Sequence, residues 1–118
     1  MDDIEKLLRE VREKNRQWEV NFFKLGELSR YANDLEKAGC LNDAIEEYKK
    51  SIEFAKSVGF KINTYARDID RLVILYRKTK QYQKEAEILN FALLQEMHPN
   101  YKAKYKDRLN KVEQLINK

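Results

Sequence analysis

Side chains that commonly bind metals or act as nucleophiles are scarce in this chain. It contains one histidine, His98, and one cysteine, Cys40, whereas a structural zinc site needs about four ligands. The three glycines, at positions 26, 39 and 59, lie too far apart to form a glycine-rich phosphate-binding loop. We therefore expect no metal site and no cofactor, and we interpret Cys40 as a small residue in a turn between helices.

Carboxylate pairs are the other candidates for catalysis. Asp68 with Asp70, or Glu46 with Glu47, could supply a general acid and a general base. Residues one or two positions apart on a helix point to different faces, however, so solvated helix surfaces explain these pairs better. The sequence thus predicts no catalytic residues and favours a protein that is not an enzyme.

Basic residues gather in the second half of the chain. The net charge is +4, but residues 1–60 carry 11 Lys and Arg against 13 Asp and Glu, while residues 61–118 carry 13 against 7. A basic surface could attract an acidic peptide, a nucleic acid or an anionic membrane, although a modest excess is also common on helical proteins. In a nucleic-acid complex, phosphates would bind Lys and Arg, and bases would stack on tyrosine. The residues concerned, in and beside segments 77–84 and 102–111, are Arg77, Lys78, Lys80, Tyr82, Lys84, Tyr101, Lys102, Lys104, Tyr105, Lys106, Arg108 and Lys111.

Composition and apolar spacing predict that helices position these groups. Hydrophobic residues make up 42% and charged residues 37% of the 118, with three glycines and one proline, which favours a single all-α domain over a sheet protein. Apolar residues recur three or four positions apart along the chain, and Gly39, Gly59 and Pro99 punctuate the pattern. We predict six helices, over residues 1–20, 21–38, 42–58, 62–78, 83–97 and 100–117. Asn42 or Asp43 would cap the third.

The junction between the first two helices is the least defined by the sequence. The apolar stripe that begins at Ile4 continues through Trp18 and Phe22, and no glycine or proline intervenes before Gly26. We predict a bend near residues 15–21, with one continuous helix as the alternative. An aromatic-rich cluster at this junction is predicted to lie in the core of the domain, with cover by a partner as the alternative; it comprises Trp18, Val20, Phe22 and Phe23.

The chain repeats itself with an offset of 41 residues. The aligned pairs are Leu28 and Ile69, Tyr31 and Leu72, Ala32 and Val73, Leu35 and Tyr76, Tyr48 and Leu89, and Ser51 and Ala92. The first four pairs lie on the first helix of each unit, and the last two lie on the second helix. A repeat whose unit is a helix pair predicts an array of antiparallel hairpins, in which each pair buries its apolar face against the next.

The residues of the first unit resemble the tetratricopeptide repeat. That family has a large residue, a large-small pair and a tyrosine on its first helix, then alanine, an aromatic residue and alanine on its second. The matching positions here are Leu28, Tyr31, Ala32, Leu35, Ala44, Tyr48 and Ser51. The 41-residue period is similar to the longer repeats of kinesin light chains. The resemblance implies an α-solenoid in a single domain of residues 1–118, with an extra helix at 1–20, repeats at 21–58 and 61–97, and a capping helix at 99–117.

The resemblance also implies a partner-binding groove lined by the first helix of each pair. Carried over by position, its lining residues are Ser29, Asn33, Glu36, Lys37, Arg67, Asp70, Ile74, Arg77, Lys78, Lys106 and Asn110. Asparagine can bond a peptide backbone through both amide atoms, and Lys and Arg can hold carboxylates. We therefore predict a non-catalytic adaptor that binds an extended or acidic peptide. Plain solvation of these polar stripes is the alternative explanation, and nucleic-acid binding is the second choice of function.

Location and assembly are also constrained by the sequence. A lone cysteine, no apolar leader and no long uncharged run favour a reducing cytoplasm and argue against a membrane partner. An array of about two repeats has two open ends and an aromatic segment at residues 18–23. Self-association into a homo-oligomer is therefore a further prediction.

Overall fold

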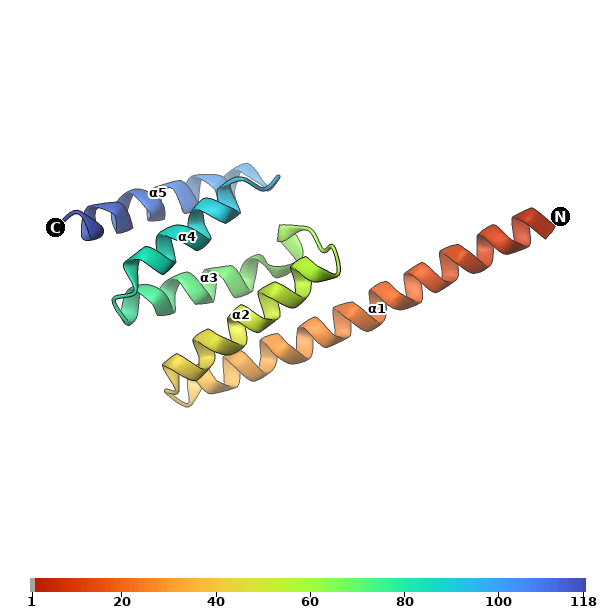
Figure 1. Ribbon diagram of the computed structural model, residues 1–118, viewed down its shortest axis with the longest axis horizontal. Helices are drawn as coiled ribbons and strands as arrows, with labels where there is room; N and C mark the ends of the chain where they lie inside the picture. Colours follow the sequence, from red (N-terminus) through yellow and green to blue (C-terminus); the bar gives the residue numbers. More distant parts are fainter. Residues whose placement is uncertain (1) are drawn as a thin grey trace.

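The computed structural model describes residues 2–118, which form five α-helices (Figure 1). They are α1 (Asp2–Lys37), α2 (Leu41–Ser57), α3 (Ile62–Lys78), α4 (Tyr82–Leu93) and α5 (Pro99–Ile116). Each helix packs against the next one in the sequence. No strand occurs among residues 2–118, and the predicted all-α array of helices packed in adjacent pairs is confirmed.

Short turns with left-handed backbone conformations join the first four helices. Gly39 has a φ of 82° and Gly59 one of 81°, and Lys80 adopts a φ of 58° at the position 41 residues after Gly39. The amide that follows each turn residue bonds back into the helix: Cys40 N to Leu35 O at 2.9 Å and Gln81 N to Tyr76 O at 2.8 Å. These bonds satisfy carbonyls at the ends of α1 and α3, so the sequence repeat is also a repeat of backbone geometry.

The bend predicted near residues 15–21 is wrong, because α1 is one helix of 36 residues. Nothing in this stretch removes a helical hydrogen bond, and Gly26 lies inside the helix without interrupting it. The proposed division between an extra helix at 1–20 and a repeat starting at 21 therefore falls inside a continuous helix. The alternative of a continuous first helix is the correct one.

Two predicted helix ends also differ from the structure. The N-cap of α2 is Cys40, and neither Asn42 nor Asp43 caps the helix, because the turn at Gly39 leads directly into it. Helix α4 ends at Leu93, four residues before the predicted end. Because Pro99 disfavours helical backbone at the residue before it, His98 lies outside both helices. His98 is instead the N-cap of α5, and its Nδ1 accepts a hydrogen bond from Asn100 N at 3.1 Å.

The core runs through the middle of the array and contains many small side chains at helix crossings. Ala32, Ala44, Ser51, Ala55 and Ala92 are all fully buried. Small residues let two helix backbones approach closely. The large members of the core fill the spaces between the crossings; among them are Tyr48, Ile69, Leu72, Leu75, Leu89, Tyr105 and Val112.

The aromatic cluster at residues 18–23 is exposed, so its predicted place in the core is wrong. Trp18 is 51% exposed and Phe23 67%. The Trp18 ring stacks on Phe22 with centroids 5.1 Å apart and meets Phe60 edge-on at 5.8 Å. Helix α1 is an edge helix with a neighbour on one side only, and for the same reason Tyr31 is 54% exposed while its repeat partner Leu72 is buried.

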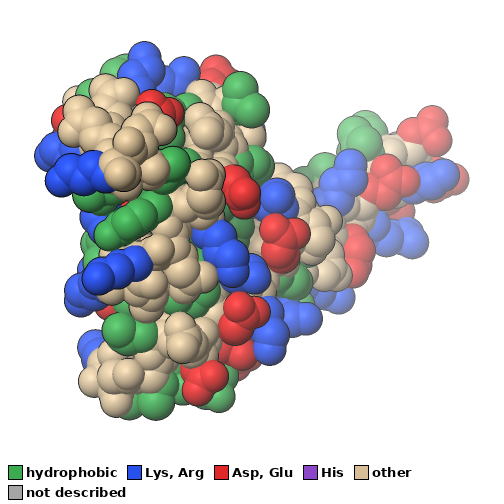
Figure 2. Space-filling model, turned by 60° about the vertical axis from the view of Figure 1, so that its left-hand side comes forward, with side chains coloured by type: hydrophobic (Ala, Val, Ile, Leu, Met, Phe, Trp, Pro, Cys, Tyr) green, Lys and Arg blue, Asp and Glu red, His purple; other side chains and the backbone are tan. Residues whose placement is uncertain are grey.

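The first half of α1 projects from the rest of the molecule. The chain extends over 67 × 32 × 19 Å, and the red and orange part of α1 has no other helix beside it (Figure 1). Acidic and basic side chains are mixed along it, with hydrophobic side chains exposed near its tip (Figure 2). We call residues 2–17 the projecting segment.

Candidate partner-binding face

Helices α1, α3 and α5 lie on one side of the array, where polar side chains join each to the next. We call this side the odd-helix face; its three helices contain all the predicted groove residues. Side-chain bridges connect α1 to α3 and α3 to α5, although these pairs are not consecutive in the chain. The groove residues therefore fall into those used inside the protein and those left for a partner.

A carboxylate of α1 is held by an arginine of α3. Arg71 binds Glu36 through two guanidinium nitrogens, with Nε 3.1 Å from Oε1, and Tyr48 donates to the same Oε1 at 2.9 Å. The hydrogen bond from Arg71 lowers the pKa of Glu36. Burial, followed by the bond to Glu36, raises the pKa of Tyr48. Glu36 therefore ties α1, α2 and α3 together as a charged group.

Asp68 makes a second, different bridge between the same helices. It is only 3% exposed, and its two oxygens accept bonds from Ser29 and Ser51, both at 2.5 Å. Burial raises the pKa of Asp68, and the two hydroxyl donors oppose that rise. Here α1, α2 and α3 meet around a carboxylate that has only neutral hydrogen-bond partners.

Glu85 is the centre of the bridge between α3 and α5. It is fully buried at the repeat position of Ala44, and Arg77 binds it with two bonds of 3.0 and 2.8 Å. Arg108 Nε lies 2.9 Å from Glu85 Oε2 but makes no aligned hydrogen bond there, so this contact is an ion pair. Burial lowers the pKa of Arg108. Two arginines thus neutralise a carboxylate that replaces a small residue of the repeat.

Backbone carbonyls complete this cluster. Arg77 Nη2 donates to Arg108 O at 3.0 Å, and Arg108 Nη2 donates to Val73 O at 3.1 Å. Close by, Tyr105 donates to Asp70 at 2.8 Å, and Lys104 lies 3.2 Å from the same carboxylate. Burial and the bond to Asp70 raise the pKa of Tyr105. Helix α5 is therefore fixed to α3 by specific polar contacts.

Four predicted groove residues are engaged inside the protein. They are Ser29, Glu36, Asp70 and Arg77. The sequence did not identify Asp68, Arg71 and Glu85 as the side-chain partners of Ser29, Glu36 and Arg77. One signal was present for Glu85, because a carboxylate at a repeat position that is otherwise small must be buried with basic partners.

Seven predicted groove residues have no ion pair or side-chain hydrogen bond with any part of the chain that the structure describes. They are Asn33, Lys37, Arg67, Ile74, Lys78, Lys106 and Asn110. Every charged member of this group is basic. The internal bridges therefore use both predicted carboxylates of the groove and leave a positive surface.

A hollow of about 360 Å³ opens on the odd-helix face between α1 and α3. Asn33, Arg30 and Arg67 border it, and Gly26 widens it because a glycine has no side chain to fill the space. Both arginines are exposed, and neither has an ion pair with residues 2–118. Asp68 also lines the hollow, but it is buried and its oxygens are bonded to Ser29 and Ser51. The exposed groups are an amide and two cations, which suit a segment that presents backbone and carboxylate groups.

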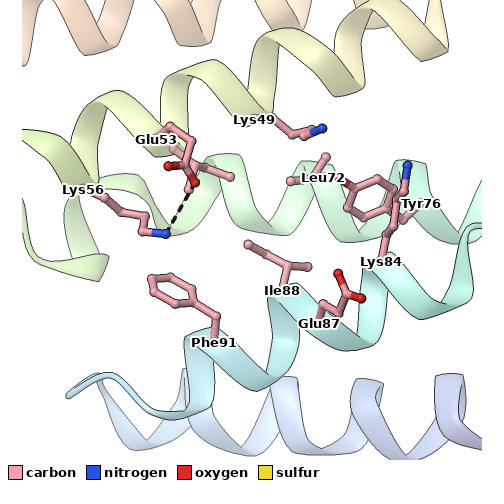
Figure 3. Close-up of a pocket in the computed structure, with 10 residues that line it drawn as sticks. Lys49, Glu53, Lys56, Leu72, Tyr76, Lys84, Glu87, Ile88 and Phe91 are labelled. Atoms are coloured by element: carbon pink, nitrogen blue, oxygen red, sulfur yellow. Dashed lines mark hydrogen bonds and ion pairs between the residues drawn. The ribbon is translucent and has the colours of Figure 1, made fainter.

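A second hollow, of about 300 Å³, lies on the opposite side, between α2 and α4 (Figure 3). Leu72, Tyr76 and Ile88 contribute apolar surface. Lys56 is placed over the Phe91 ring at 4.4 Å and pairs with Glu53 at 3.4 Å. Its lining carries both lysines and glutamates and contains none of the predicted groove residues.

The carboxylate pairs considered for catalysis do not form pairs in space. Asp68 contacts Ser29 and Ser51, whereas Asp70 contacts Tyr105 and Lys104. Glu46 and Glu47 pair with different lysines of α2. Within residues 2–118, no three His, Cys, Asp or Glu side chains gather where a metal ion could be held. None of the described helices is both long and apolar enough to span a bilayer.

The alternative nucleic-acid surface is partly used inside the protein. Tyr105 is fully buried, and Tyr101 packs near it with ring centroids 6.1 Å apart. Arg77 and Arg108 bind Glu85, and Lys111 pairs with Asp107 at 3.2 Å. Lys78, Lys80, Lys84 and Lys106 are exposed. Of the three tyrosines predicted for this surface, Tyr105 is therefore inaccessible, whereas Tyr82 is half-buried and Tyr101 is 37% exposed.

The fold defines the protein as an all-α array of helical hairpins. Comparisons with protein-family models, with curated protein sequences and with solved structures find no significant match for this chain. The resemblance to the tetratricopeptide repeat stays a prediction from the sequence.

Proposed function

We propose that this protein is a non-catalytic adaptor that binds an extended acidic peptide on its odd-helix face. The observation that supports this is the sign of the remaining charges. Glu36 and Asp70 are neutralised by Arg71 and Lys104, while Lys37, Arg67, Lys78 and Lys106 have no acidic partner within residues 2–118. A segment rich in Asp and Glu would supply the missing partners.

The hollow between α1 and α3 supports a mode of binding. Asn33 would bond the peptide backbone, and Arg30 and Arg67 would bind carboxylates on either side of it. The tetratricopeptide resemblance favours the same face, since proteins of that family commonly hold extended peptides along their first helices. Exposed, unpaired Cys40 favours a reducing compartment, and we place the adaptor in the cytoplasm.

A titration of labelled peptides tests this proposal. The probe is a fluorescein-labelled fifteen-residue peptide of alternating Glu and Ser, with a Gln/Ser peptide and a single-stranded oligonucleotide of equal charge as controls. We expect the acidic peptide to bind more tightly than both controls. Arg67→Ala or Asn33→Ala should each weaken binding by about 1–3 kcal/mol, because a few directional contacts dominate such interfaces.

Lys84→Ala is the matched control, since Lys84 borders the hollow between α2 and α4. It should leave peptide binding unchanged. Equal losses for Lys84→Ala and Arg67→Ala would contradict a site on the odd-helix face. Tighter binding of the oligonucleotide, with a stepwise loss for each lysine removed, would favour the nucleic-acid alternative.

A further inference from the structure

The projecting segment carries an apolar stripe that no part of the described chain covers. Ile4, Leu7, Leu8 and Val11 are exposed by 63, 60, 49 and 47%. Ile4, Leu8, Val11 and Asn15 follow one another at alternating spacings of four and three residues. This is the heptad pattern of a helix that pairs with another helix.

The same stripe is covered in the second half of α1. Leu25 and Ala32 continue the spacing and are buried where α1 packs against α2. Trp18, between the two parts, is still 51% exposed, although its ring meets Phe60 at the turn before α3. The stripe over residues 2–17 is therefore a helix-pairing surface without a second helix.

We propose that the second helix is the projecting segment of another copy of this chain, paired antiparallel. In this arrangement Ile4 faces Asn15 of the second copy, and Leu8 faces its Val11. Each pair occurs twice because of the two-fold axis. Asp2 of one segment then lies level with Gln17 of the other, so residues 2–17 of the two copies lie alongside each other.

Charge complementarity supports this alignment. The stripe is flanked on one side by Glu5 and Arg12, and in an antiparallel pair residues of this side face each other. Glu5 then lies opposite Arg12 of the second copy, twice per dimer. Neither residue has an ion pair with residues 2–118, where the ion pair of the projecting segment joins Arg16 to Glu13 at 3.5 Å.

Other pairings of two copies fit less well. A parallel pair would place both helical arrays at the same end, where α2 already covers the stripe from Leu25 onward. Sliding the antiparallel pair inward by one heptad would bring Glu5 opposite Glu19 and Arg12 opposite Arg12. It would also bring Leu8 opposite Trp18 of the other copy, which already contacts Phe60. Repulsion and this contact both disfavour that alignment.

Sedimentation equilibrium of charge-reversed variants tests the proposal. Glu5→Arg and Arg12→Glu should each weaken the dimer about tenfold, since each places two like-charged contacts in the interface. The double variant restores both contacts with reversed sign and should return to within about twofold of the wild type. Glu5 and Arg12 are both exposed in a single copy of the chain, so these substitutions should not change the fold.

Apolar substitutions give a second comparison. Leu8→Ser should abolish dimerisation over the measured concentrations, while Val20→Ser, at an equally exposed position outside the stripe, should leave it unchanged. A chain that is monomeric at every concentration would overturn the proposal. So would a double charge reversal that fails to restore the dimer.

Cysteine cross-linking determines the direction of pairing. In a Cys40→Ser background, Ile4→Cys with Asn15→Cys should form an intermolecular disulfide, because the two positions share a layer and lie too far apart within one helix. Asn15→Cys alone should not cross-link. Cross-linking of this single variant would show a parallel pair and would overturn the antiparallel arrangement.

Discussion

The bridge between α1 and α3 and the bridge between α3 and α5 hold alternate helices together by different chemistry. Between α1 and α3, one carboxylate has hydroxyl partners and the other has a half-exposed arginine. Between α3 and α5, a fully buried carboxylate has two arginines. A buried charge without a partner costs far more than a buried hydroxyl, so the two bridges should respond very differently to mutation and to pH.

Arg77→Ala should have the largest effect. The substitution leaves Glu85 buried with Arg108 as its one charged partner, and that contact is not an aligned hydrogen bond. Loss of one partner from a buried ion pair costs about 3–5 kcal/mol of unfolding free energy. Urea unfolding measures the loss. Adding Glu85→Ala should recover part of the stability, because alanine occupies the equivalent buried position 44. A single variant within 0.5 kcal/mol of the wild type, a limit of about the size of ordinary surface effects, would contradict the buried-pair assignment.

Arg71→Ala should have a smaller effect that depends on pH. The Arg71 side chain is 35% exposed, so we expect a loss of about 1 kcal/mol that shrinks in high salt. The pKa of Glu36 is lowered in the fold, so the stability it contributes is present above its unfolded pKa and is lost as the pH falls through its folded pKa. The difference between variant and wild type should therefore vanish in acid.

The exposed and unpaired Arg30 provides the control for this measurement. Arg30→Ala should leave the unfolding free energy unchanged at every pH. A loss for Arg71→Ala that persists undiminished at low pH would mean that side-chain packing, and not the ion pair with Glu36, stabilises this bridge.

Asp68→Asn should show the opposite dependence on pH. Burial raises the pKa of Asp68, so its contribution to stability is present below its unfolded pKa and is lost as the pH rises through its folded pKa. Asparagine can accept from one serine and donate to the other. We expect the variant to match the wild type in acid and to be more stable by about 1 kcal/mol at pH 7, as neutral partners suit a neutral group.

Thermal unfolding across the acid range measures this difference, with Asp34→Asn, at an exposed position, as the control. A variant that is less stable than the wild type at pH 7 would show that the charge of Asp68 is required by the bridge.

Lys80→Gly should have the smallest effect and should increase stability. Lys80 has a φ of 58°, whereas the equivalent turn after α1 has Gly39. Glycine adopts this conformation without strain, so we expect a gain of about 0.5–1 kcal/mol. Lys84→Gly, inside α4, should instead destabilise the protein by a similar amount. Equal losses for both variants would argue against strain at Lys80.

The candidate site was only partly predictable from the sequence. Spacing of three and four residues placed Ser29, Asn33 and Glu36 correctly on one face of α1, because helical geometry is local. The sequence did not distinguish Arg77, which binds Glu85, from Arg67, which is exposed. That distinction depends on which residues of the neighbouring helices lie close to each arginine. The one indication in the sequence was Glu85, which stands at the repeat position of Ala44.

The sequence by itself determined the helical class, the turns at Gly39 and Gly59, and the packing of consecutive helices, since these follow from short-range spacing and backbone preference. Only the tertiary structure decided which apolar stripes are covered. Ile4, Leu8 and Val11 continue the spacing of Leu25 and Ala32, yet the first three are exposed and the last two buried. Periodicity specifies which face of a helix is apolar; the length of the neighbouring helix decides how much of that face is buried, and α2 extends along the second half of α1 alone.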